Sequence, residues 1–129
     1  MVARDIMTRD VITARPSLSV KELAMLMVKN QISGLPVSDE AGKIIGLVSE
    51  ADIIAKKGKN VQAIMSQQVF SVTEETSIEE IAQLMTTHRI KRVPVMNGGK
   101  LVGIVSRADI VNTIAMGDNV ALHTPVYDL

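Results

Sequence analysis

The sequence contains one unit twice. Residues 6–37 are matched by residues 64–95 at an offset of 58, and both copies open on Ile-Met-Thr/Ser and close on Pro-Val. After the turn at 38–43 the offset becomes 57, and Gly46–Ile53 matches Gly103–Ile110. Apolar, Gly and Pro positions keep their order across the unit, which indicates a duplication. The chain is therefore expected to fold as two copies of one small structure.

Each copy predicts the element order β-α-β-β-α. The first helix opens on a capping box, Ser19-x-x-Glu22 or Ser77-x-x-Glu80, and continues with one apolar face at helical spacing. A Pro-containing strand, a polar Gly-rich turn and a nearly all-apolar returning strand follow. The elements are expected at 11–13, from Ser19, at 35–37, at 44–48 and from Ser49 in copy one, and at 69–71, from Ser77, at 93–95, at 101–105 and from Ser106 in copy two.

This order predicts an α/β (α+β) fold class in which the two repeats pack as a pseudo-two-fold pair, because one small sheet cannot bury its helices alone. The expected boundaries are 1–57 for the first domain, 58–116 for the second and 117–129 for a C-terminal tail. The linker at 56–63 is polar and is expected to form a loop. Since a proline removes a ladder donor, Pro36 and Pro94 are expected at a sheet edge or an opening.

The amino-acid composition argues against several classes of function. The 129 residues carry no net charge and no cysteine, which argues against general attraction to DNA or anionic membranes and excludes disulfides and thiolate sites. No apolar run is long enough to span a membrane, so a cytoplasmic protein is expected. His88 and His123 lack partners for a metal site. No nucleophile has an adjacent base and no phosphate loop is present, so we predict no enzyme activity.

The chain resembles the cystathionine-β-synthase (CBS) domain family. The resemblance rests on the Ile-Met-Thr opening, the capped helix, the Pro-Val strand and the Gly-apolar-apolar-Ser-x-x-Asp-Ile junction, and it covers residues 3–114 in both copies. It implies a tandem pair, called a Bateman module, with two clefts between the copies that accept adenosine-containing ligands. It also implies a homodimer.

The junction motif supplies the candidate ligand groups. A carboxylate can accept both ribose hydroxyl protons, and in the resembled family the Asp holds the ribose while the Ser faces phosphate. Asp52 and Asp109 are therefore the ribose candidates. The alternative is that Ser49-x-x-Asp52 and Ser106-x-x-Asp109 are only helix caps. The two interpretations are compatible.

The resemblance also implies that each cleft combines the Ser and Asp of one copy with the early strand and pre-Pro segment of the other. The expected nucleotide-binding residues are Ser49, Asp52, Ser66, Val69, Ser71, Ile90, Lys91 and Arg92 in one cleft, and Ser106, Asp109, Thr8, Val11, Thr13, Ile32, Ser33 and Gly34 in the other. Because Lys91-Arg92 replaces Ser33-Gly34, we expect the Asp52 cleft to bind a phosphorylated adenosine more tightly.

The leading prediction is a regulatory module that binds AMP, ADP, ATP or a related adenosyl compound and acts on an unidentified partner protein. No catalytic cofactor and no metal are expected. One alternative is a ligand-independent dimerisation or scaffold module. Another is a nucleic-acid-binding protein that uses the Lys91-Arg92 patch, which the zero net charge disfavours.

Overall fold

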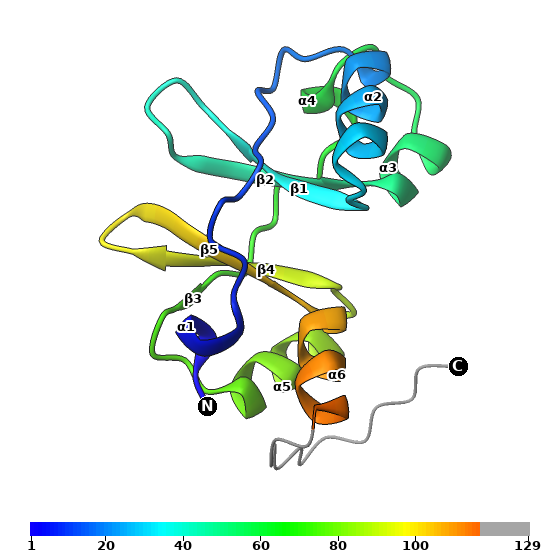
Figure 1. The fold of residues 1–129 in the computed structure, drawn as a ribbon. Helices are drawn as coiled ribbons and strands as arrows, with labels where there is room; N and C mark the ends of the chain where they lie inside the picture. Colours follow the sequence, from blue (N-terminus) through cyan, green and yellow to red (C-terminus); the bar gives the residue numbers. More distant parts are fainter. Residues whose placement is uncertain (117–129) are drawn as a thin grey trace. The chain divides into compact units, whose positions relative to one another are not determined.

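The computed structural model describes residues 1–116, with mixed helices and short strands (Figure 1). The chain divides into two compact units. Unit 1 combines Met1–Val11 with the residues from Phe70 onward, and unit 2 is Ile12–Val69. The predicted α+β fold class is confirmed. The predicted tail at 117–129 lies outside the described residues.

Unit 2 is a two-stranded antiparallel sheet covered by helices. Its elements are α2 (Val20–Asn30), β1 (Gly34–Ser38), β2 (Ile44–Ser49), α3 (Glu50–Ala55) and α4 (Val61–Ile64). The predicted capping box opens α2, because Ser19 Oγ accepts from the Glu22 N–H at 3.1 Å and Glu22 Oε1 accepts from the Ser19 N–H at 3.3 Å. The helix ends at Gln31, whose φ of 55° is left-handed.

The segment that was expected to be a loop contains helix α4. Asn60 caps it by accepting from the Ala63 N–H at 3.1 Å, and Val61 and Ile64 are 0% and 1% exposed. Val61 and Ile64 have the spacing of one helical face. This spacing went unrecognised in the sequence because the residues before Val61 are polar. The loop prediction was therefore wrong for residues 61–63.

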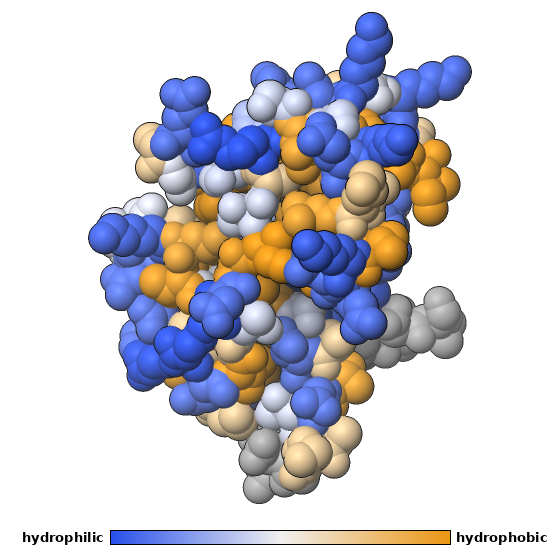
Figure 2. Space-filling view, turned by 45° about the horizontal axis from the view of Figure 1, so that its top comes forward, coloured by the Kyte–Doolittle hydropathy of each residue, from blue (hydrophilic) through white to orange (hydrophobic). Residues whose placement is uncertain are grey.

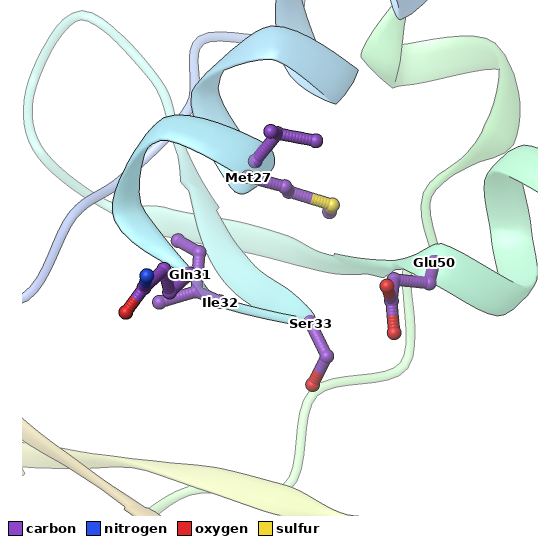
Figure 3. A pocket seen from close by; sticks show the side chains of 6 residues that line it. Met27, Gln31, Ile32, Ser33 and Glu50 are labelled. Atoms are coloured by element: carbon purple, nitrogen blue, oxygen red, sulfur yellow. The ribbon is translucent and has the colours of Figure 1, made fainter.

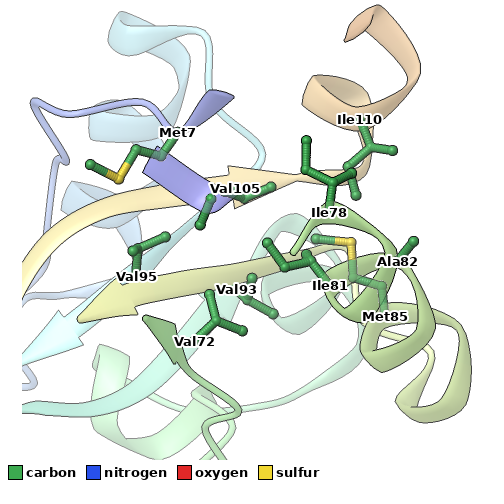
Figure 4. Packing of buried hydrophobic residues seen from close by; sticks show 11 residues of the cluster. Met7, Val72, Ile78, Ile81, Ala82, Met85, Val93, Val95, Val105 and Ile110 are labelled. Atoms are coloured by element: carbon green, nitrogen blue, oxygen red, sulfur yellow. The ribbon is translucent and has the colours of Figure 1, made fainter. Parts of the chain in front are cut away.

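Unit 1 repeats this plan with one more strand. Its elements are α1 (Ala3–Ile6), β3 (Val72–Thr73), α5 (Ile78–His88), β4 (Arg92–Asn97), β5 (Lys100–Ser106) and α6 (Arg107–Ala115), with strand order β3-β4-β5. Branched side chains of β4 and β5, such as Val93 and Val105, meet Ile78, Ile81 and other residues of α5 in the core (Figure 4).

The early strands are shorter and later than predicted. In copy one only Ala14 makes a parallel bridge to Val37, and in copy two β3 is confined to Val72–Thr73. Pro94 lies on the central strand β4 rather than on an edge strand. It is accommodated because β3 pairs only with the two residues that follow it, Val95 and Met96.

The short helices α1 and α4 occupy equivalent places but in exchanged units. The helix that opens copy one, α1, packs in unit 1 with copy two, and α4, which opens copy two, packs in unit 2 with copy one. Equivalent bridges fix both exchanges. They are Thr8 to Ile104 and Val2 to Ser77 in unit 1, and Ser66 to Leu47 and Asn60 to Ser19 in unit 2.

On the surface of unit 1, α1 is also held by an ion pair. The Arg4 guanidinium donates to both carboxylate oxygens of Glu75, and this hydrogen bond and charge raise the pKa of Arg4. The Arg4 and Glu75 side chains are 44% and 68% exposed, so the buried Ala3 and Met7 contribute more to docking than the ion pair does.

Candidate functional site

The Ser-x-x-Asp junction of unit 2 places a carboxylate against the end of β2. The Ser49 N–H donates to Asp52 Oδ2 at 2.9 Å and Ser49 Oγ donates to the same oxygen at 3.3 Å. Asp52 Oδ1 forms an ion pair with Lys56 Nζ at 2.9 Å, and the Asp52 side chain is 15% exposed. Lys56 Nζ also donates to the Ile64 carbonyl at 3.1 Å, which ties this site to α4.

Unit 1 contains the equivalent arrangement. The Ser106 N–H donates to Asp109 Oδ2 at 2.8 Å, and the Asp109 N–H donates back to Ser106 Oγ at 3.1 Å. Thr113 stands where unit 2 has Lys56, and its hydroxyl donates to the Asp109 carbonyl at 2.9 Å. Ser106-x-x-Asp109 is thus a reciprocal helix cap. In Ser49-x-x-Asp52 the carboxylate accepts from the Ser49 N–H, but the Ser49 hydroxyl donates to Asp52 and, within residues 1–116, does not accept from a backbone N–H.

Two of the predicted hydroxyl residues lie beside the second strand of a hairpin. Ser66, which follows α4, lies beside β2, and Thr8, which follows α1, lies beside β5. Leu47 and Ser66 form a pair of backbone hydrogen bonds at 2.8 and 3.0 Å, two residues before Ser49. Thr8 and Ile104 do the same at 2.9 and 3.0 Å, two residues before Ser106. Within its own unit each junction is therefore accompanied by the Thr or Ser that the sequence assigned to it.

The hairpin pairing sets the position of the residues that precede Pro36 and Pro94. Gly34 is the register partner of Ser49, and the Glu50 N–H donates to the Ser33 carbonyl at 2.9 Å. In unit 1, Arg92 is the partner of Ser106, and the Arg107 N–H donates to the Lys91 carbonyl at 2.8 Å. The hairpin makes Lys91 and Arg92 chain neighbours of the Asp109 junction within unit 1. Their expected grouping with Asp52, which lies in the other unit, stays a prediction.

The other predicted residues differ in exposure. Val11, Val69, Ile32 and Ile90 are half-buried, while Thr13 and Ser71 are exposed. Val11 and Ser71 lie in unit 1, and Thr13, Ile32 and Val69 lie in unit 2. Among residues 1–116, no hydrogen bond or ion pair joins these side chains to the carboxylate of Asp52 or Asp109.

A pocket of about 300 Å³ adjoins the unit 2 junction (Figure 3). Met27 and Ile32 form apolar walls, and Ser33 and Glu50 stand at the side of the β1 and α3 starts. Val28 and Gln31 complete the lining. Sequence reasoning missed Glu50, Gln31 and Met27, although Glu50 directly follows the predicted Ser49.

Residues 1–116 contain no group of three or more His, Cys, Asp or Glu side chains placed to hold a metal ion. They also contain no helix with the length and apolarity needed to cross a membrane.

Two consecutive repeats, each with a capped helix, a β-hairpin and a Ser-x-x-Asp junction into a second helix, define a tandem repeat module. The family model of the CBS domain matches residues 3–58 and 61–116. The chain therefore belongs to the CBS-domain family, and it holds two CBS domains in tandem.

Curated relatives include small and large proteins. A CBS domain-containing protein of Bacillus subtilis, YhcV, is 32% identical over 83% of this chain and 81% of its own length. An L-aspartate semialdehyde sulfurtransferase and an inosine-5′-monophosphate dehydrogenase of Methanocaldococcus jannaschii are 33% and 34% identical. The chain spans only 22% and 23% of the length of these two enzymes.

Solved structures of similar fold hold adenosyl ligands. The CBS domain pair of protein MJ0100, in complex with 5′-methylthioadenosine and S-adenosyl-L-methionine, aligns at a TM-score of 0.86 with 30% identity, covering 92% of this chain and 98% of that one. CBSX2 in complex with AMP aligns at 0.82 with 29% identity, covering 89% and 96%.

Proposed function

We propose that the chain is a regulatory module, without enzyme activity of its own, that binds an adenosine-containing ligand at its Ser-x-x-Asp junctions. The observation that carries this is the orientation of Asp52 and Asp109, each held by a backbone N–H at 2.8–2.9 Å. A carboxylate oxygen has lone pairs beyond those that the cap uses. A ribose that offers two hydroxyl protons suits such a group.

The ligands of the similar structures support this assignment. AMP, 5′-methylthioadenosine and S-adenosyl-L-methionine share adenosine and differ in the group attached at the 5′ carbon. A module of this kind regulates a partner only if the ligand binds two conformations with different affinity. We propose that the partner is a separate, unidentified protein and, because the chain lacks cysteine, that both act in the reducing cytoplasm.

Isothermal titration calorimetry with AMP and with S-adenosyl-L-methionine tests the proposal. We expect saturable binding of at least one of them and a tenfold or greater loss in a variant that carries both Asp52→Asn and Asp109→Asn. Asparagine keeps a capping oxygen but removes the charge that accepts two ribose protons. Glu40→Gln, at an exposed turn, is the matched control. Failure of every adenosyl compound to bind would contradict the proposal.

A ligand-independent dimerisation module is the second candidate, and exposed apolar side chains favour it. Val28 and Ile54 in unit 2 are 79% and 86% exposed, and Val111 in unit 1 is 63% exposed. Figure 2 shows hydrophobic side chains at the surface between hydrophilic ones. We propose that these residues bury surface in a homodimer. Sedimentation velocity of the wild type and of Ile54→Asp, without ligand, tests this.

A further inference from the structure

Two helices of unit 2 expose apolar side chains on one surface. On α2, Met25 and Val28 lie one turn apart and are 62% and 79% exposed, and on α3, Ile54 is 86% exposed. Glu50 lies one turn before Ile54, on the same side of α3. Val28, Gln31 and Glu50 line one pocket, so the two helices share this surface (Figure 3). We call Met25, Val28, Gln31, Glu50 and Ile54 the unit 2 face.

Unit 1 has different side chains at the five repeat-equivalent positions. Arg107 opens α6 as Glu50 opens α3, so a cation replaces the acid. Arg89 is a second, exposed cation at the end of α5. The Arg107 N–H donates at 2.8 Å to the carbonyl of Lys91, two residues after Arg89, so α6 begins beside this segment. Val111 on α6 is apolar and 63% exposed. The unit 1 face consists of Gln83, Thr86, Arg89, Arg107 and Val111.

The two faces therefore carry opposite formal charge. Glu50 gives the unit 2 face one negative charge, and Arg89 and Arg107 give the unit 1 face two positive charges. The chain as a whole has 14 acidic and 14 basic residues, so the opposition is a local property of these surfaces. Exposed apolar side chains rimmed by polar groups are typical of a protein–protein contact.

A contact between two copies of the chain can join like faces or unlike faces, and the charges distinguish the two arrangements. A two-fold contact between like faces brings the same patch of each copy together. Two unit 2 faces would then set acid against acid, and two unit 1 faces would gather four arginines. Unlike faces set Glu50 of one copy against Arg89 and Arg107 of the partner subunit. Opposite charges fix the orientation of a contact, and like charges suppress the alternative.

We infer that two copies of the chain associate through unlike faces. The unit 2 face of one copy packs on the unit 1 face of the other, with Ile54 against the partner's Val111 and Glu50 beside the partner's Arg107. Burial of the apolar side chains stabilises the contact, and the charges set its direction. This inference rests on the homodimer proposed above as the second candidate function, and it adds which surfaces meet.

Cross-linking tests the orientation, because the chain has no cysteine and an introduced thiol is unique. Ile54→Cys and Val111→Cys are prepared separately and treated with a short bis-maleimide, each alone and then as an equimolar mixture. Both positions are exposed, so neither change disturbs a core. We expect cross-linked dimer from the mixture and only the collisional background from each variant alone. Glu40→Cys, at an exposed turn, measures that background.

Efficient cross-linking of each variant with itself, and none across the mixture, overturns the inference and leaves the homodimer standing. Background cross-linking in every sample, from a wild type that sedimentation velocity shows to be monomeric, overturns the inference and the homodimer together. Neither result bears on adenosyl binding.

Exchange of the charges tests what fixes the orientation. Glu50→Arg places a cation against the partner's arginines and should weaken the dimer about tenfold in sedimentation equilibrium without ligand. Adding Arg107→Glu to the same chain should recover part of that loss. Glu40→Arg, the same charge change at the exposed turn, is the matched control and should have no effect. A dimer of Glu50→Arg as stable as the wild type overturns the inference, because a contact of like faces would not lose an attraction.

Discussion

Met7 lies against Gly103, and its thioether occupies the space that a Cβ atom on the glycine would need. Met65 has the same relationship to Gly46, where a Cβ would stand 2.7 Å from the sulfur. Met7 follows α1 and Met65 follows α4. The missing side chains of Gly103 and Gly46 therefore leave room for these methionines to pack on the strands.

Replacing Gly103 by alanine should destabilise the protein by about 1–3 kcal/mol, because an added methyl overpacks a filled site. Urea denaturation followed by circular dichroism measures this. Met7→Ala also destabilises, but the loss in the double variant should be smaller than the sum of the two single losses, since the clash is chiefly with that side chain. At Gly46 the Ser66 carbonyl is also only 2.8 Å away, so Met65→Ala should rescue Gly46→Ala less well. Equal rescue at both sites would contradict this account.

Removing the cap of α5 should have a smaller effect. Ser77 Oγ accepts from the Glu80 N–H at 3.1 Å, and Ser77→Ala should lower the free energy of unfolding by about 1 kcal/mol. The exposed Ser17, which precedes the cap of α2, provides the control in Ser17→Ala. A loss of the same size in both variants, measured in urea, would show that the cap is unimportant.

The two neighbours Ala3 and Arg4 should respond differently to substitution. Ala3 is 0% exposed, so Ala3→Asp buries an unpaired carboxylate and should cost about 3 kcal/mol or more. Arg4→Ala removes only the exposed pair with Glu75 and should cost less than about 1 kcal/mol. Thermal unfolding ranks the two, and amide exchange should show weakened protection in β5 and α6, which α1 contacts, for Ala3→Asp. A reversed ranking would contradict the docking of α1.

Ligand binding should raise the unfolding temperature in a concentration-dependent way. A ligand that binds only the native state stabilises it by about 2.7 kcal/mol at a hundredfold excess over Kd. Differential scanning calorimetry over a range of AMP concentrations measures this, and adenine-free ribose 5-phosphate is the control for general anion effects. A rise of equal size with the control would point to charge alone.

The repeat and its local signals predicted most of the fold. Capping boxes such as Ser19-x-x-Glu22 and the apolar returning strands are local features, so helices and hairpins followed from short windows of sequence. The exchange of α1 and α4 could not be predicted in this way. Both helices carry matching residues, and local periodicity does not say which sheet a short helix will cover.

The site was predicted in part for a similar reason. Asp52 and Asp109 were found through the junction motif, and the structure confirms that both act in caps. Their role toward a ligand stays a prediction. The grouping of Lys91 and Arg92 with Asp52 also stays a prediction, whereas their place in the hairpin, with Arg92 opposite Ser106, follows from counting back from the turn. The pocket beside Glu50 needs three-dimensional packing of Met27 and Ile32, which no spacing reveals.

The exchanged helices also constrain how such a module can be cut or inherited. A boundary drawn between the repeats near residue 57 would separate Val61 and Ile64 from the core that they complete, and a fragment that starts at Phe70 would lack Ala3 and Met7. Neither repeat alone therefore encodes a complete hydrophobic core. Recombination that preserves folding should carry the whole pair, so the two junctions evolve together even where their charges diverge.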